Sequence, residues 1–144
     1  SIAEEGISGD FDIESVRFGV CSTIGTPDVT IKIGTLAAAP GAMLDPTDIT
    51  PLGSASATIQ PTLIPKLIDV PITGTVPAGG QLVVEVRTAD QLGSGNQFTI
   101  GVTAADEERP AYLRAALCGT PNATQTTTAG VPDAHVVLTV TGSR

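Results

Sequence analysis

Short runs of alternating apolar and polar residues, separated by glycine and proline, constrain the fold of this chain more than any other feature. In Gln81–Thr88, Leu82, Val84 and Val86 have one parity, while Glu85 and Arg87 have the other. Successive side chains of a strand point to opposite faces, so one face is expected in a core and the other in solvent. Similar runs occupy residues 29–33, 56–60, 67–73, 98–102 and 134–141.

This repeated pattern predicts an all-β fold with almost no helix. We expect an antiparallel β-sandwich, jelly-roll or Ig-like, with about seven to nine short strands. A closed barrel is the alternative architecture. The last run, 134–141, is predicted to be an inner strand, with a central place in a sheet as one option.

The first strand has a break in its alternation. Phe11 and Ile13 share one parity, whereas the apolar positions 16, 18 and 20 have the other. A β-bulge near Glu14 and Ser15 would bring both sets onto one buried face. Three segments are less regular. Residues 37–54 are predicted to be a long surface excursion, 111–117 a short helix or an irregular segment, and 120–132 a Thr-rich loop.

Length and charge limit the function classes. The chain of 144 residues fits one domain, which we place at 10–144 after an N-terminal extension, 1–9. The formal net charge is −8 and the basic residues are dispersed, so a nucleic-acid partner is not expected. Every apolar run is far shorter than a membrane-spanning helix, so membrane insertion is not expected either.

The two cysteines, Cys21 and Cys118, allow two interpretations. They lack the CxxC spacing of redox or zinc sites, so they are either buried free thiols or one disulfide. Cys21 ends an early strand and Cys118 lies in a loop, which favours the disulfide. Closing so long a loop would stabilise the fold by about 4 kcal/mol in the chain-entropy model.

The residue types needed for catalysis are sparse. His135 is the only histidine, it opens an apolar strand, and no nucleophile motif accompanies it, so we expect no enzyme activity. Asp106, Glu107 and Glu108 form an acidic loop that is the best candidate for calcium, with solvated surface acids as the alternative. No other cofactor is expected. Tyr112, the sole tyrosine, is expected to pack at the core edge, with ligand contact as the alternative.

Several motifs together resemble a poorly characterised β-sandwich accessory module of secreted and cell-surface bacterial proteins. They are LVVEV at 82–86, FTIGV at 98–102, YLRAALCG at 112–119 and HVVLTVTG at 135–142. The resemblance implies export, a sandwich fold and a cysteine in the YLRAALCG segment. It implies no catalytic residues. An extracellular or cell-surface location, with Ser1 following a removed signal peptide, is therefore expected.

Two functions follow from these observations. The first is a non-enzymatic structural or interaction protein that self-associates into a surface filament or layer, with Ile2 and Ile7 docking the N-terminal extension on another subunit as an added strand. Its partner would be another copy of the chain or another surface protein or polymer. The alternative is an accessory polymer- or carbohydrate-binding module of a larger secreted hydrolase. A chain with no Trp and one Tyr is poorly suited to glycan stacking.

Overall fold

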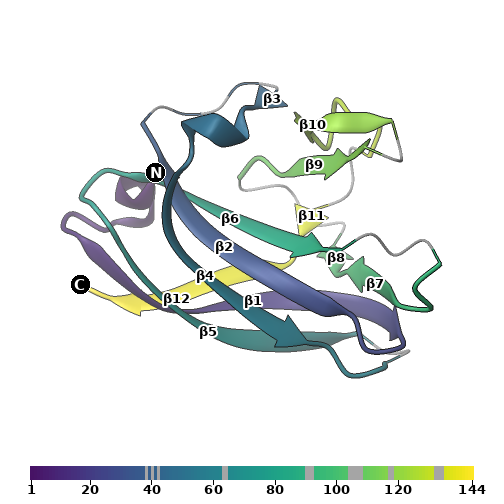
Figure 1. The fold of residues 1–144 in the computed structure, drawn as a ribbon. Helices are drawn as coiled ribbons and strands as arrows, with labels where there is room; N and C mark the ends of the chain where they lie inside the picture. Colours follow the sequence, from purple (N-terminus) through teal and green to yellow (C-terminus); the bar gives the residue numbers. More distant parts are fainter. Residues whose placement is uncertain are drawn as a thin grey trace.

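The computed structural model describes residues 1–144 except 38, 40, 42, 63–64, 90–92, 104–108, 117–118 and 132–134. The described residues are mostly antiparallel strands, with two short 3₁₀ helices, η1 and η2 (Figure 1). The all-β prediction is therefore confirmed. In chain order the elements are η1 (Ile2–Glu5), β1 (Phe11–Ile24), β2 (Asp28–Leu36), β3 (Met43–Leu44), η2 (Pro46–Asp48), β4 (Thr50–Thr58), β5 (Lys66–Val76), β6 (Gln81–Thr88), β7 (Gln97–Ile100), β8 (Val102–Thr103), β9 (Tyr112–Ala115), β10 (Thr120–Gln125), β11 (His135–Val136) and β12 (Leu138–Ser143).

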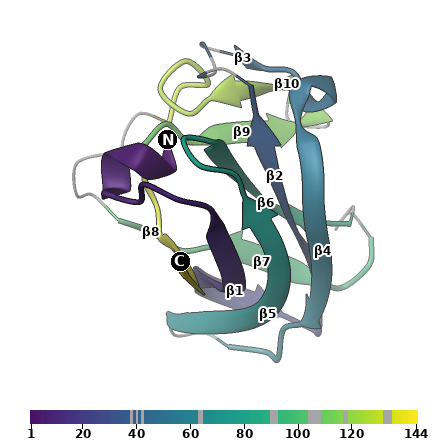
Figure 2. The same cartoon turned by 90° about the vertical axis from the view of Figure 1, so that its left-hand side faces the viewer.

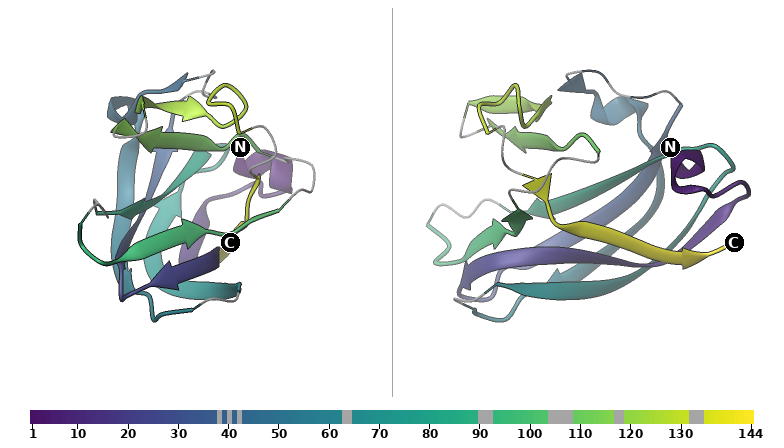
Figure 3. Two further views of the ribbon diagram at one scale, coloured as in Figure 1. Left: turned by 90° about the vertical axis from the view of Figure 1, so that its right-hand side faces the viewer. Right: turned by 180° about the vertical axis from the view of Figure 1, so that it is seen from behind.

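Two larger sheets carry the core. One has the order β12-β1-β5, with β7 also paired to β1, and the other has the order β4-β2-β6. Their long strands run across the lower part of the molecule in Figure 1. In Figure 2, β1 and β5 lie at the bottom and β2, β4 and β6 rise on the right, and Figure 3 shows the same strands from two further sides. There are two smaller sheets among the described strands: β3-β10-β9 at the top of Figure 1, and β11-β8 below it, near β7.

Strand β1 organises the first sheet because it pairs along both of its edges. Its register with both β12 and β5 shifts between Ile13 and Ser15, which places a bulge at Glu14. Ile13, Val16 and Phe18 are all buried as a result. The bulge predicted from the break in alternation is therefore confirmed, together with the single buried face that it creates.

The core lies between the two larger sheets. Residues from β1, β2 and β5 meet there, and Ile2 and Ile59 complete the cluster. Burial of these branched side chains removes apolar surface from water, which is the dominant favourable term in folding. The buried set is Ile2, Ile13, Val16, Phe18, Val20, Val29, Ile31, Ile33, Ile59, Val70, Ile72 and Val76.

Three backbone segments meet where β1 stops pairing with β12 and begins to pair with β7. The amide of Gly19 donates to the Val137 carbonyl (2.8 Å), Val137 donates to Gly101 (3.0 Å), and Gly101 donates back to Gly19 (2.7 Å). Beyond this junction β1 pairs with β7 instead of β12. A Cβ atom at Gly101 would lie 2.8 Å from the Gly19 carbonyl carbon, so this close approach requires glycine.

The structure corrects several predictions about individual segments. The excursion at 37–54 ends early, because β4 begins at Thr50 and pairs with β2. Residues 120–125 form β10 in place of a loop, and 112–115 form β9 in place of a short helix or an irregular segment. The last strand is not central: β12 lies at the edge of its sheet. Local sequence does not supply the pairings of β4 and β12, because their partners β2 and β1 lie elsewhere in the chain, whereas β9 and β10 are neighbours in sequence and pair with each other.

The junction gives a direct stability test. We expect Gly101→Ala to destabilise the fold by about 2 kcal/mol, because the new methyl group would overlap backbone atoms that cannot move independently. Gly9→Ala is the matched control, since a Cβ there meets nothing within 4 Å. Urea unfolding of both variants measures the difference. Equal stabilities would show that the junction is not tightly packed.

Candidate functional site

The N-terminal segment, Ser1–Ile7, docks on its own chain. The Ile2 amide donates to the Gly80 carbonyl (3.0 Å), and the Ser1 hydroxyl donates to the Gly79 carbonyl (3.2 Å). Ser1 and Glu4 form a capping box around η1, and Gly6 ends it in the left-handed conformation. This segment is a short 3₁₀ helix and not an extended strand, so an inter-subunit strand is not the form that it takes here.

Ile2 is the anchor of this segment. Only 5% of its surface is exposed, and Ile7 packs against the same core cluster. Ile2 and Ile7 therefore pack within their own chain in this structure, and their docking on another subunit stays a prediction. In this conformation the extension completes the core of its own chain, because moving the isoleucine side chain from water into the core lowers the free energy of the folded state.

Charged groups on the segment are all exposed. The N-terminal ammonium pairs with Glu4 (2.8 Å), and Arg109 pairs with Glu5 and lies 3.8 Å from Glu4. The hydrogen bond and charge of the N-terminus, with a smaller contribution from Arg109, lower the pKa of Glu4. Exposed ion pairs of this kind contribute little to stability, so apolar burial of Ile2 is the main attachment.

Cys21 does not form the predicted disulfide. It is a free thiol whose side chain is exposed on β1, next to the register shift between Val20 and Ser22. Its expected partner, Cys118, lies outside the described residues. The position of Cys21 on the solvent side of the strand explains why it contributes nothing to the core.

The candidate chemical residues do not come together. The described residues contain no group of three His, Cys, Asp or Glu side chains that could hold a metal ion. The calcium candidates Asp106, Glu107 and Glu108 lie outside the described residues. His135 lies on β11, opposite Thr103 of β8, and its Nδ1 atom is buried without a hydrogen-bond partner among the described residues.

Tyr112 has a structural contact. Its hydroxyl donates to the Gly41 carbonyl (2.6 Å), which ties β9 to the segment before β3. The packing of Tyr112 at the core edge stays a prediction, because the described core cluster does not include it. Among the described residues, no helix is long and apolar enough to cross a membrane.

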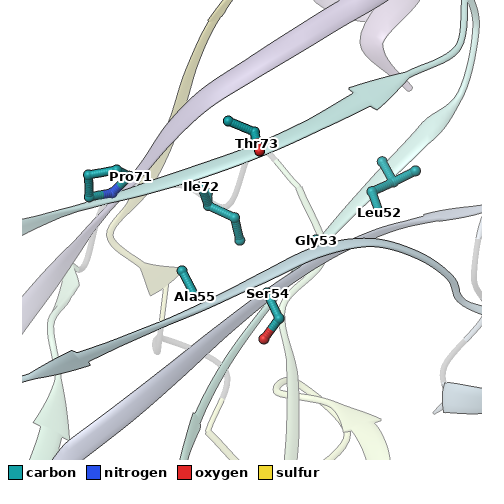
Figure 4. Close-up of a pocket in the computed structure, with 7 residues that line it drawn as sticks. All are labelled: Leu52, Gly53, Ser54, Ala55, Pro71, Ile72 and Thr73. Atoms are coloured by element: carbon teal, nitrogen blue, oxygen red, sulfur yellow. The ribbon is translucent and has the colours of Figure 1, made fainter.

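One shallow hollow lies between β4 and β5, with a volume of about 430 Å³ (Figure 4). Both strands are irregular there: Leu52 is an extra residue in β4, and Ile72 and Thr73 lie opposite the single residue Glu14. Its lining is apolar or hydroxylic and contains no charged or aromatic side chain. The lining residues are Leu52, Gly53, Ser54, Ala55, Pro71, Ile72 and Thr73.

The strand edges of the two larger sheets differ in how they are protected. On one side, edge strands β4 and β5 lie against each other, and a Cβ at Gly53 would lie 2.5 Å from the Thr73 carbonyl. Pro51 and Pro71 and the two bulges interrupt these edges. Prolines and bulges prevent an edge from accepting another strand.

On the other side, β12 is a regular edge strand. Among the described strands it pairs with β1 alone, and it makes no contact with β6 comparable to that between β4 and β5. Its sequence, LTVTGS, contains no proline and no charged residue. The outer edge of β12 is therefore the feature of the described structure best suited to binding, and the sequence pattern, which predicts an inner strand with a central place as one option, does not indicate it.

Comparison with known proteins yields no match, since no family model, curated protein or solved structure is significantly similar to this chain. The resemblance to a secreted accessory module therefore stays a prediction.

The N-terminal anchor can be tested with a pair of isoleucines. We expect Ile2→Ala to destabilise the protein by about 2 kcal/mol and to make residues 1–9 more sensitive to protease, because it removes a buried side chain. Ile24→Ala removes the same atoms from a residue that is 52% exposed, so its effect should stay within about 0.5 kcal/mol. Thermal unfolding and limited proteolysis measure both effects, and equal losses would contradict the anchor role.

The state of Cys21 has its own test. Because the thiol is exposed, iodoacetamide should alkylate Cys21 in the folded protein without prior reduction. Mass spectrometry of the peptide that contains Cys21 measures the modification, with Cys21→Ser as the control. Recovery of a peptide in which Cys21 is bonded to Cys118 would contradict the free thiol and restore the predicted bridge.

Proposed function

We propose that this chain is a non-enzymatic extracellular structural or interaction protein, and that its copies associate into a surface filament or layer. The observation that carries the proposal is the outer edge of β12, which is uncharged, free of proline and paired with no other strand among the described residues. An edge of this kind presents a row of backbone donors and acceptors to another strand. Soluble proteins usually protect such edges, so an unprotected one fits a binding role.

The contrast with the opposite side of the molecule supports this interpretation. The β4 and β5 edges carry Pro51 and Pro71 as well as bulges, and they also lie against each other. The β4 and β5 edges therefore resist strand addition, whereas β12 contains no proline. The proposed association therefore begins at one defined edge, β12, in place of indiscriminate aggregation.

The two larger sheets share one core between them, which fits a sandwich of the jelly-roll or Ig-like kind. Sandwiches of this kind commonly present strand edges to partners. The extracellular location rests on the resemblance of the LVVEV, FTIGV and HVVLTVTG motifs. The free thiol of Cys21 gives it no support.

For the alternative function, a polymer- or carbohydrate-binding module, the hollow between β4 and β5 is the candidate site described above. That hollow lacks the aromatic rings on which sugars stack, and no charged side chain lines it. The edge of β12 therefore favours self-association over glycan recognition.

Self-association should depend on both concentration and salt. The net charge of −8 makes the copies repel one another, and added salt screens this repulsion. Sedimentation velocity of the full chain should show species larger than the monomer as concentration rises, with tighter association at 0.5 M than at 0.05 M NaCl. A strictly monomeric protein at all concentrations and both salt levels would contradict the proposed function.

A further inference from the structure

We infer that β12 pairs with β12 of a second copy of this chain, antiparallel about a two-fold axis near Val140. The inference rests on the proposed function and specifies the surface and the partner that it uses. The pairing joins the two β12-β1-β5 sheets into one continuous sheet across the axis. A two-fold contact closes on itself, so it forms a dimer, the building unit of any larger assembly.

The backbone of β12 shows which groups are free for this pairing. Gly19 donates to the carbonyl of Val137, so this carbonyl faces β1, while the Val137 amide donates to Gly101. Backbone groups alternate sides along a strand, which directs Thr139 and Thr141 toward β1 as well. The amides and carbonyls of Leu138, Val140 and Gly142 consequently point to the open edge.

These free groups fit a self-complementary register. With Val140 on the axis, it pairs with Val140 of the second copy, and Leu138 pairs with Gly142 of the second copy on either side. Each such pair exchanges two hydrogen bonds, so the interface gains about six. Proline, which would remove a donor, does not occur among the residues of β12.

The side chains fit the same register. Thr139 lies opposite Thr141 of the second copy on the outer face, and both are exposed in the single chain. Cross-strand threonine pairs are favourable, and no like charges oppose each other along the strand. On the inner face, the half-buried Leu138 and Val140 pack at the edge of the core, so pairing would bury more of their apolar surface.

The other edge of the second sheet is a poorer partner for β12. Strand β6 places Glu85 and Arg87 among its residues, and Glu85 lies 3.7 Å from Arg114 of β9. An uncharged strand such as β12 pairs most favourably with another uncharged strand, because the pairing then removes no charged side chain from water. The self-pairing of β12 meets this condition, whereas β6 does not.

Charge substitutions on the outer face of β12 test the pairing. Thr139→Lys/Thr141→Lys should weaken association at least about tenfold, because lysines of the two copies then oppose each other in both cross-strand pairs. Thr139→Glu/Thr141→Glu should weaken it likewise. An equimolar mixture of the two variants should associate again as a heterodimer, because every opposed pair is then Lys with Glu.

The control carries the same charges on a different strand. Ser54→Lys/Ser56→Lys places two lysines on exposed positions of β4, so it should associate as the unmodified chain does. Sedimentation velocity measures association, and circular dichroism shows that each variant is folded. If the unmodified chain associates but the β12 variants associate equally well, or their mixture does not recover, the β12 pairing is wrong and the proposed function stands. If the unmodified chain stays monomeric, the proposed function itself fails.

Discussion

Burial of the inner face of β1 is the constraint on which the rest of the structure depends. Val16, Phe18 and Val20 are fully buried, and the bulge at Glu14 adds Ile13 to the same face. Because β1 pairs with β5 along one edge and with β12 and then β7 along the other, its position fixes the whole first sheet. The second sheet follows, since Val29, Ile31 and Ile33 of β2 pack on the same core.

The arrangement of the edges follows from this core. Strands β4 and β5 close one side by direct approach, which Gly53 permits. On the other side, Ile2 enters the core from the N-terminal segment, while β12 has no second strand among the described residues. One protected side and one open side give the molecule a single preferred surface for adding a strand. A filament or layer would need a further contact beyond the two-fold pairing of β12.

The sequence predicts local features well and long-range ones poorly. The break in alternation at 11–20 predicts the bulge at Glu14, because the parity of apolar residues reports which face is buried. The edge position of β12 cannot be predicted in this way, because the sequence pattern of an apolar strand is the same in the middle of a sheet and at its edge. Ile2 appears free in a polar extension, and only the fold shows its place in the core. The exposure of Cys21 likewise depends on a register shift in its pairing with β7.

Residue-specific hydrogen exchange along β12 tests the open edge most directly. In dilute, monomeric protein the amides of Leu138, Val140 and Gly142 should exchange rapidly, while those of Thr139 and Thr141 are protected by β1. At concentrations where the protein associates, the first three should become protected and the alternation should disappear. Protection of the Leu138 and Val140 amides already in the monomer, or unchanged exchange on association, would contradict an edge that binds a second copy.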